Sequence, residues 1–210
     1  MRHLTSDDIQ SLPSRFRAQF INSITGVKSA NLIGSVSARG NTNLAIFSSV
    51  VHLGSNPALL GFLLRPTTVE RHTFNNIKET SAFTINQVQT HFIDKAHQTS
   101  AKYNHNISEF EAVGLEEEFL SDCKAPFVKS APLKIACRYK NEYVIEENGC
   151  RLIIGEVTDV FYQKQIQSKD GFLDLTQTDT AGILGSDAYV KIDLLHRYEY
   201  AQPDQVLKTK

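Results

Sequence analysis

The sequence has few cysteines, no excess of charge of either sign and no long apolar run. Its cysteines, Cys123, Cys137 and Cys150, are an odd number without CxxC spacing, which is typical of free, buried thiols in a reduced, cytoplasmic protein. The 22 basic and 23 acidic residues give a formal net charge of -1, whereas nucleic-acid-binding proteins usually have a basic excess. The longest apolar stretch, about Ala58–Leu64, is far shorter than the ~20 residues of a membrane helix. The N-terminal segment Met1–Asp8 lacks the apolar region of a signal peptide. We therefore expect no nucleic-acid partner and no membrane partner.

Signature motifs of common enzyme classes are also missing. The sequence contains no GxGxxG and no GxxxxGK[ST], so neither a Rossmann fingerprint nor a P-loop is expected. It contains no GxSxG, which disfavours a serine hydrolase, and nothing marks any of the cysteines as catalytic. The histidines are scattered, without HExxH or zinc-ligand spacing, so no metal site is expected.

The composition of the 210 residues, 41% hydrophobic and 21% charged, is that of a globular protein and predicts one domain over residues 1–210. Residues 1–25 are interpreted as an N-terminal helical extension. Its helix is expected to start at Thr5–Asp8, to hold Pro13 in its first turn and to end near Gly26. Residues from about 90 to 120 are interpreted as a helical insert.

Six segments rich in β-branched and aromatic residues alternate with short turns and predict strands. These segments are Asn31–Ala38, Asn43–Leu53, Ala58–Arg65, Ala82–Val88, Leu133–Glu146 and Arg151–Gln165. Gly171–Leu175 and Tyr189–Tyr200 are two shorter candidates, and Asn148-Gly149 predicts a hairpin. The frequent local turns favour an antiparallel barrel or sandwich, so the predicted fold class is mainly β with α decorations.

Helical spacing occurs in two further segments. It covers Thr68–Thr80, where Thr67 or Thr68 is the expected cap, and Phe92–Ala101. The acidic segment Glu109–Leu120 is interpreted as a solvated helix face or turn.

Two segments collect small polar residues where predicted strands end. Asn41–Ser49 and Leu64–Ile77 together offer hydroxyl groups, side-chain amides, two arginines and a predicted helix start. Guanidinium groups, hydroxyl groups and free N–H groups at a helix start are what a phosphate group requires. The alternative is that these side chains form an ordinary hydrated strand face.

Read in order, these segments resemble the flavin reductase-like, FMN-binding split-barrel family. The motifs are Gly40-x-x-Asn43-x-Ala45-x-x-Ser48-Ser49, Arg65-Pro66, Arg71-His72-Thr73, Asn76-Ile77, Phe83-Thr84-Ile85-Asn86 and Ser108-Glu109-Phe110-Glu111-x-x-Gly114-Leu115. The resemblance extends from about residue 25 to about residue 195. The chain departs from the family pattern at Pro57-Ala58, where two prolines are common, and at His72-Thr73, where Lys-Asp-Thr is common.

The resemblance implies a homodimer of six-stranded antiparallel Greek-key split β-barrels with FMN near the subunit interface. It implies a flavin reductase that uses NADH or NADPH as co-substrate and often supplies reduced flavin to a monooxygenase partner. Nothing in the sequence favours one pyridine nucleotide over the other.

The resemblance also implies site residues. Those expected to line the isoalloxazine and ribityl chain are Asn43, Ala45, Ser48 and Ser49. The phosphate candidates are Arg65, Thr67, Thr68, His72, Thr73 and Asn76. Candidates for the pocket over the flavin are His97, Ser100 and Tyr189, for each of which a structural role is an equal alternative. No catalytic acid or base is identified.

Three hypotheses follow. The chain is an FMN-dependent NAD(P)H:flavin oxidoreductase, an FMN-binding electron carrier or sensor without reductase activity, or a β-barrel binding module that takes no flavin.

Overall fold

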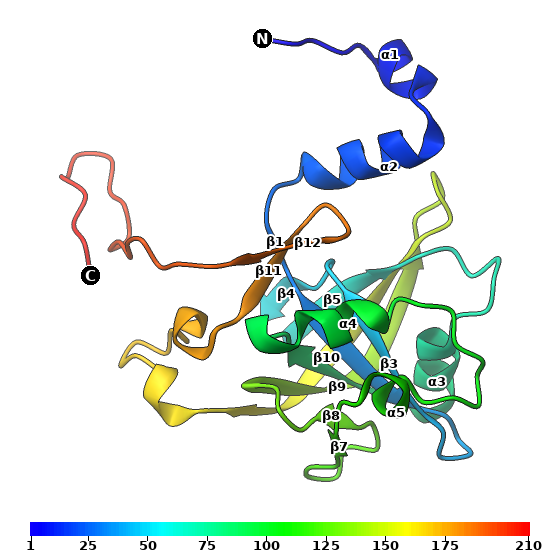
Figure 1. Ribbon diagram of the computed structural model, residues 1–210. Coiled ribbons are helices and arrows are strands. Elements are labelled where there is room, and N and C mark those ends of the chain that lie inside the picture. Colours follow the sequence, from blue (N-terminus) through cyan, green and yellow to red (C-terminus); the bar gives the residue numbers. More distant parts are fainter.

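The computed structural model describes all 210 residues and is built on a seven-stranded antiparallel sheet (Figure 1). The strand order is β3-β2-β6-β9-β10-β5-β4. The strands are β2 (Asn31–Val36), β3 (Thr42–Phe47), β4 (Val51–Ser55), β5 (Ala58–Leu64), β6 (Ala82–Gln87), β9 (Leu133–Val144) and β10 (Arg151–Tyr162). A three-stranded sheet contains β1 (Lys28–Ser29), β11 (Ala181–Leu184) and β12 (Ala188–Lys191), and β7 (Glu117–Glu118) pairs with β8 (Phe127–Val128).

The main sheet has seven strands rather than the six expected, because one predicted strand is broken. The segment Asn43–Leu53 forms β3 and β4, which are separated by residues 48–50. These two strands are consecutive in the chain, yet they form opposite edges of the sheet and do not pair with each other. The chain must leave one edge and join the other, so the strand has to end at this point. The mainly β fold with α decorations is confirmed.

β2 is buried along its whole length because both of its faces are covered. Successive side chains of a strand point to opposite faces. Ile33 therefore joins the cluster inside the barrel, whereas Leu32 joins a second cluster on the other face. Inside the barrel, the ring of Phe62 makes edge contacts with the rings of Phe47 and Phe83, at centroid distances of 4.9 Å and 5.5 Å.

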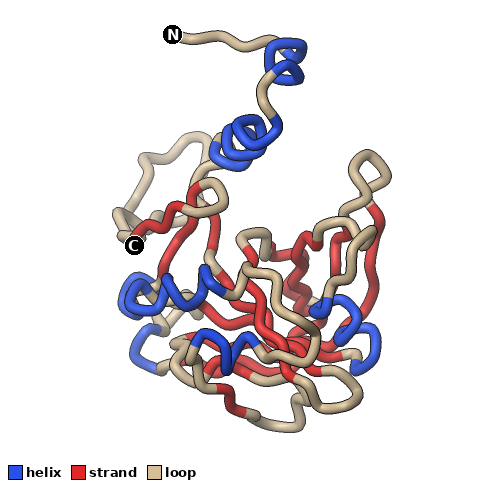
Figure 2. Tube along the Cα trace, turned by 45° about the vertical axis from the view of Figure 1, so that its right-hand side comes forward, coloured by secondary structure: helices blue, strands red, loops and turns tan.

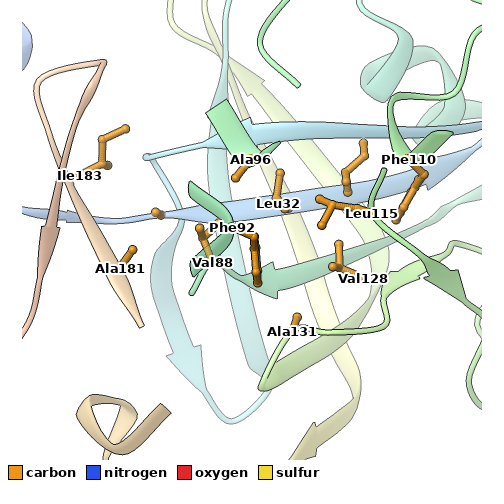
Figure 3. Packing of buried hydrophobic residues seen from close by; sticks show 12 residues of the cluster. Leu32, Val88, Phe92, Ala96, Phe110, Leu115, Val128, Ala131, Ala181 and Ile183 are labelled. Carbon is orange, nitrogen blue, oxygen red and sulfur yellow. The ribbon is translucent and has the colours of Figure 1, made fainter. Parts of the chain in front are cut away.

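The second cluster lies beneath the segment that was predicted as a helical insert (Figure 3). This segment contains a 3-10 turn (Thr90–Phe92), α4 (Ile93–Gln98) and α5 (Glu109–Val113). Its buried apolar side chains are Phe92, Ala96, Phe110 and Leu115. The insert thus covers the outer face of β2 and β3 with side chains that the sheet alone would leave exposed to water.

The N-terminal region forms two helices rather than one. α1 (Ser6–Ser11) has a capping box between Thr5 and Asp8, which confirms the predicted start. Pro13 is not in the first turn of a single helix but precedes α2 (Ser14–Ser23), because proline lacks the N–H that a continuous helix requires. α1 and α2 bury no residue and lie outside the main sheet (Figures 1 and 2). α2 touches the β11–β12 turn, where Gln19 donates to Asp187 at 2.6 Å and accepts from the Ser186 hydroxyl group at 3.0 Å. No helix has the length and apolar character needed to cross a bilayer.

Several predicted boundaries also differ. α3 (His72–Thr80) begins four residues after Thr68, and Arg71 rather than a threonine occupies its N-cap position. Residues 171–175 form no strand, and the strand expected at Tyr189–Tyr200 ends at Lys191. The β9–β10 hairpin is present, but its turn spans residues 145–150.

The three cysteines form no disulfide. Only Cys137 is fully buried, and burial raises the pKa of its thiol well above the usual range. Cys123 and Cys150 are half-buried rather than buried as expected.

Candidate functional site

The linker between β3 and β4 is the point where the barrel is split. The backbone N–H groups of Ser48, Ser49 and Val50 donate to no backbone or side-chain acceptor in the chain. The Ser49 hydroxyl group donates to the carbonyl of Leu63 and accepts from its N–H, both at 3.1 Å. Ser49 thus ties the linker to β5, and the linker presents free backbone donors beside that strand.

β3 turns two of the predicted site residues, Asn43 and Ala45, toward the barrel interior. Asn43, Ala45 and Phe47 lie on one side of the strand because side chains alternate, and Phe47 belongs to the interior cluster. The amide nitrogen of Asn43 donates to Thr73 Oγ1 at 3.1 Å, and both residues are buried. This bond places the start of α3 directly against β3 and leaves the hydroxyl proton of Thr73 available.

The loop from Arg65 to Arg71 connects β5 to α3. Arg65 and Thr68 are exposed and make no hydrogen bond or ion pair within the chain. The first turn of α3 receives no side-chain cap, so its backbone N–H groups are not bonded by an N-cap side chain. The loop therefore combines a free guanidinium, a free hydroxyl and an uncapped helix start, which are the donors expected for a phosphate.

A cavity of about 250 Å³ lies between α3 and the β2–β3 turn. Asn43, His72 and Asn76 contribute to its lining. The His72 ring lies 4.0 Å from the Glu70 carboxylate and 6.4 Å, centroid to centroid, from the His105 ring. The amide nitrogen of Asn76 donates to Ser35 Oγ at 3.2 Å, so this buried side chain already links α3 to β2.

Two of the three pocket candidates lie together. His97 Nδ1 is 3.1 Å from the Tyr189 hydroxyl oxygen, although 92 residues separate them in the chain. Burial, with a smaller effect of Asp187, raises the pKa of Tyr189 to about 12. Tyr189 packs on the outer cluster together with Ile46 of β3. Ser100 is exposed and its side chain makes no hydrogen bond, so it does not join this pair.

Glu109 was not a candidate, and its assignment to a solvated acidic segment is wrong. The residue is 5% exposed, and its carboxylate accepts the N–H of Leu44 at 3.0 Å. Beside it, the hydroxyl groups of Ser108 and Thr42 are hydrogen-bonded at 2.8 Å. β3 is an edge strand with one unpaired side, and α5 occupies that side through these two contacts. The sequence signal was the Ser108-Glu109-Phe110 motif, in which the neighbouring phenylalanine is a core residue.

Arg151 was also not a candidate. Its Nε donates to Thr67 Oγ1 at 3.3 Å, and its Nη1 donates to Glu142 at 2.8 Å. The guanidinium lies over the Phe74 ring, 5.2 Å from its centroid. Eighty-four residues separate Arg151 from Thr67, so their contact could not be predicted from the sequence. The Asn148-Gly149 hairpin motif predicted only that Arg151 follows a turn.

Comparison with known proteins places the whole barrel in one family. Residues 27–178 match the model of the flavin reductase like domain. This match spans the segments that hold β1 to β10 and the loop from Arg65 to Arg71.

Solved structures show the same fold. A split-barrel protein of Shewanella frigidimarina NCIMB 400, which carries a provisional flavin reductase name, is 47% identical, with a TM-score of 0.92 over 96% of this chain and 100% of that chain. Component B of nitrilotriacetate monooxygenase from Bacillus cereus is 18% identical, with a TM-score of 0.80 over 93% of this chain and 97% of that chain. Flavoredoxin of Desulfovibrio vulgaris (Miyazaki F) is 20% identical, with a TM-score of 0.70 over 85% of this chain and 92% of that chain. The last two show the fold alone.

Proposed function

This chain belongs to the flavin reductase-like family, and we propose that it is an FMN-dependent NAD(P)H:flavin oxidoreductase. The observation that carries the proposal is the linker at the split, where Ser48, Ser49 and Val50 hold three backbone N–H groups without acceptors. These residues are half-buried, so donors without a partner in the chain are left for water or for a ligand. The carbonyl oxygens and ring nitrogens of a flavin edge are suitable acceptors.

The loop that follows β5 suits the phosphate of FMN. Ser49 is hydrogen-bonded to Leu63 on β5, and Arg65 lies two residues after Leu63. The free N–H groups of the linker are therefore close to the basic loop. Arg65, Thr68 and the uncapped start of α3 would bind the phosphate, and the hydroxyl proton of Thr73 would add a further donor. Asn43 orients Thr73 and, with Ala45, faces the interior side of β3.

FMN, when bound, accepts a hydride at N5 from a reduced nicotinamide and passes electrons to an acceptor. The task of the chain is to bind and orient the two rings, which requires no acid or base. Backbone N–H groups at Ser48 and Ser49 would stabilise the negative charge that develops along the pyrimidine edge of the flavin, because fixed donors need no reorganisation. The half-buried serines at these positions add little bulk, so the backbone can be approached closely.

For the nicotinamide side we propose the His97–Tyr189 pair. The two rings are nearly perpendicular, at 87°, and their centroids are 5.8 Å apart. Tyr189 is protonated near neutral pH and keeps a hydroxyl donor, and its raised pKa extends this state to more alkaline pH. The pair would provide an aromatic wall for NADH or NADPH, and no residue in it selects between the two.

We also propose that the chain is a homodimer. The outward face of β4, β5 and β10 is mainly apolar, with Glu156 opposite Leu59 as its charged member. Cross-strand partners share a face, and the alternate residues of β5 and β10 point into the barrel. The residues of this face are Val51, Leu53, Leu59, Leu63, Leu152 and Ile154. No other element of the chain covers it, and Val51, Leu53 and Leu63 are each at least 40% exposed. Contiguous apolar patches of this kind usually mark interaction sites.

Replacement of Leu63 by lysine tests the dimer. The side chain is 43% exposed, so the folded monomer should tolerate the change, whereas a buried lysine should weaken a dimer by at least about tenfold in Kd. Light scattering during size-exclusion chromatography over a dilution series measures this constant. Ile107→Lys is the matched control, because Ile107 is 42% exposed but lies in the loop before α5. Equal behaviour of both variants would contradict the proposed interface.

A monooxygenase that consumes reduced flavin is the partner we propose, by analogy with nitrilotriacetate monooxygenase component B. The three free cysteines suit a cytoplasmic location, because thiols stay reduced there. We propose the same location for the partner.

The absorption spectrum of the purified protein tests the function. We expect flavin bands near ~450 nm after addition of FMN, and we expect NADH or NADPH to bleach them in the absence of oxygen. Bands that persist with both nucleotides would contradict reductase activity and indicate an electron carrier or sensor. No bands and no thermal shift with FMN would contradict flavin binding itself, since a ligand that binds the folded state raises Tm.

A further inference from the structure

We infer that Arg151 is a further residue of the phosphate site formed by the loop from Arg65 to Arg71, where it holds Thr67 in place and favours a phosphorylated flavin over an unphosphorylated one. This inference rests on the proposed function, because it concerns the phosphate end of the same site. The residue comes from β10, on the far side of the hairpin, and is not part of the motifs from Arg65 to Thr73.

Arg151 contacts both the loop from Arg65 to Arg71 and the helix α3 that follows it. Nε donates to Thr67 Oγ1, so Thr67 uses a lone pair for this bond and keeps its own hydroxyl proton for another acceptor. The guanidinium plane lies over Phe74, the third residue of α3. One side chain therefore contacts the middle of the loop and the first turn of the helix.

The Arg151 side chain is itself held on its other side. Glu142 on β9 accepts from Nη1, and the Tyr139 hydroxyl donates to the other oxygen of the same carboxylate at 3.0 Å. Lys78 Nζ lies 3.6 Å from Glu142. The Arg151 side chain is 24% exposed, which leaves it accessible to a ligand while these contacts limit its motion.

Within the network itself, positive charge exceeds negative charge. Arg151 and Lys78 carry two positive charges against the single negative charge of Glu142. The neighbouring loop holds Arg65, Glu70 and Arg71, and the exposed Glu146 and Glu147 lie in the β9–β10 turn. Lys78 and Arg151 share one neutralising carboxylate, so the network keeps a net positive charge that attracts an anion. Because Arg151 is partly buried, solvent and salt screen this charge less than they would at an exposed site. A dianionic phosphate monoester gains from this field, and a neutral ribityl hydroxyl group does not.

The test compares FMN with riboflavin, which lacks the phosphate, by quenching of flavin fluorescence. We expect Arg151→Met to weaken FMN binding by about tenfold or more and to change riboflavin binding by less than about twofold. Arg151→Lys should give an intermediate FMN affinity, because lysine keeps the charge but cannot donate to Thr67 and Glu142 together in the same fork geometry. Increasing salt should weaken FMN binding less in Arg151→Met than in the unchanged protein.

Arg138→Met is the matched control, since Arg138 is an exposed arginine of β9 without an ion pair, and it should leave both affinities unchanged. Equal weakening of FMN and riboflavin by Arg151→Met would overturn the inference and assign the residue a purely structural role. FMN binding that Arg151→Met does not alter would also overturn it, while the proposed function would stand. Failure of the unchanged protein to bind either flavin would overturn the proposed function and this inference together.

Discussion

Replacement of Gly34 by alanine is expected to destabilise the protein by about 3 kcal/mol or more. An added Cβ would lie 2.2 Å from the carbonyl oxygen of Pro126 and 2.6 Å from Thr84 Oγ1, which are themselves hydrogen-bonded to each other. Backbone atoms cannot move aside as a flexible side chain can, so β2 or the segment at Pro126 must shift. Gly34, Thr84 and Pro126 are all buried, so water cannot fill the space that a shift would open. The loss would be a large part of a typical free energy of unfolding.

Chemical denaturation followed by circular dichroism measures this effect. Gly54→Ala is the control, because its added Cβ would lie 3.3 Å from its nearest neighbour, the carbonyl oxygen of Pro57, on the exposed strand β4. A Gly34→Ala protein as stable as the Gly54→Ala protein would show that β2 does not pack against Pro126 as described.

The second large effect is expected at Glu109, where glutamine and leucine variants separate charge from hydrogen bonding. Glutamine keeps an oxygen that can accept the N–H of Leu44, whereas leucine leaves this fully buried N–H without a partner. We therefore expect the leucine variant to be about 1–3 kcal/mol less stable than the glutamine variant. Equal free energies of unfolding for the two variants would contradict the role of Glu109 in closing the edge of β3.

The pH dependence of stability gives a separate test of Glu109. Burial raises the pKa of its carboxyl group, and the N–H groups of Leu44 and Glu109 and the nearby His72 only partly oppose this shift. The folded protein then binds the proton more tightly than the unfolded chain does. The contribution of Glu109 to the free energy of unfolding is complete below its ordinary pKa and is lost as the pH rises through the raised value.

Glu109→Gln should remove this loss. Relative to the unchanged protein, the glutamine variant is expected to gain stability as the pH rises from about 4 to about 8. Urea titrations at several pH values measure the difference. Parallel stability profiles for the two proteins would contradict a raised pKa at Glu109.

The sequence predicted those strands, helix starts and turns that depend on residues close together in the chain. The runs of β-branched residues gave the main strands, Thr5 and Asp8 form the expected capping box, and Asn148-Gly149 marks a real hairpin. The order of the motifs was enough to predict the split-barrel family, which the match over residues 27–178 confirms. Alternation of side chains and turn chemistry act over a few residues, so they can be read directly from the chain.

The break within Asn43–Leu53 could not be predicted in the same way. Residues 48–50 have no proline or glycine that would end a strand. The strand ends because the closing sheet needs β3 and β4 at opposite edges, which is a property of the whole barrel. The same closure leaves the N–H groups of Ser48 and Ser49 without partners.

The sequence by itself determined the strand segments, the hairpin, the family and a set of polar residues suited to a phosphate. Only the tertiary structure decided which of these residues lie together, because it joins Asn43 to Thr73 and His97 to Tyr189. It also brought in Glu109 and Arg151, whose partners Leu44 and Thr67 are 65 and 84 residues away. Contacts over such separations depend on strand order and packing, and no short-range pattern of residue types encodes them.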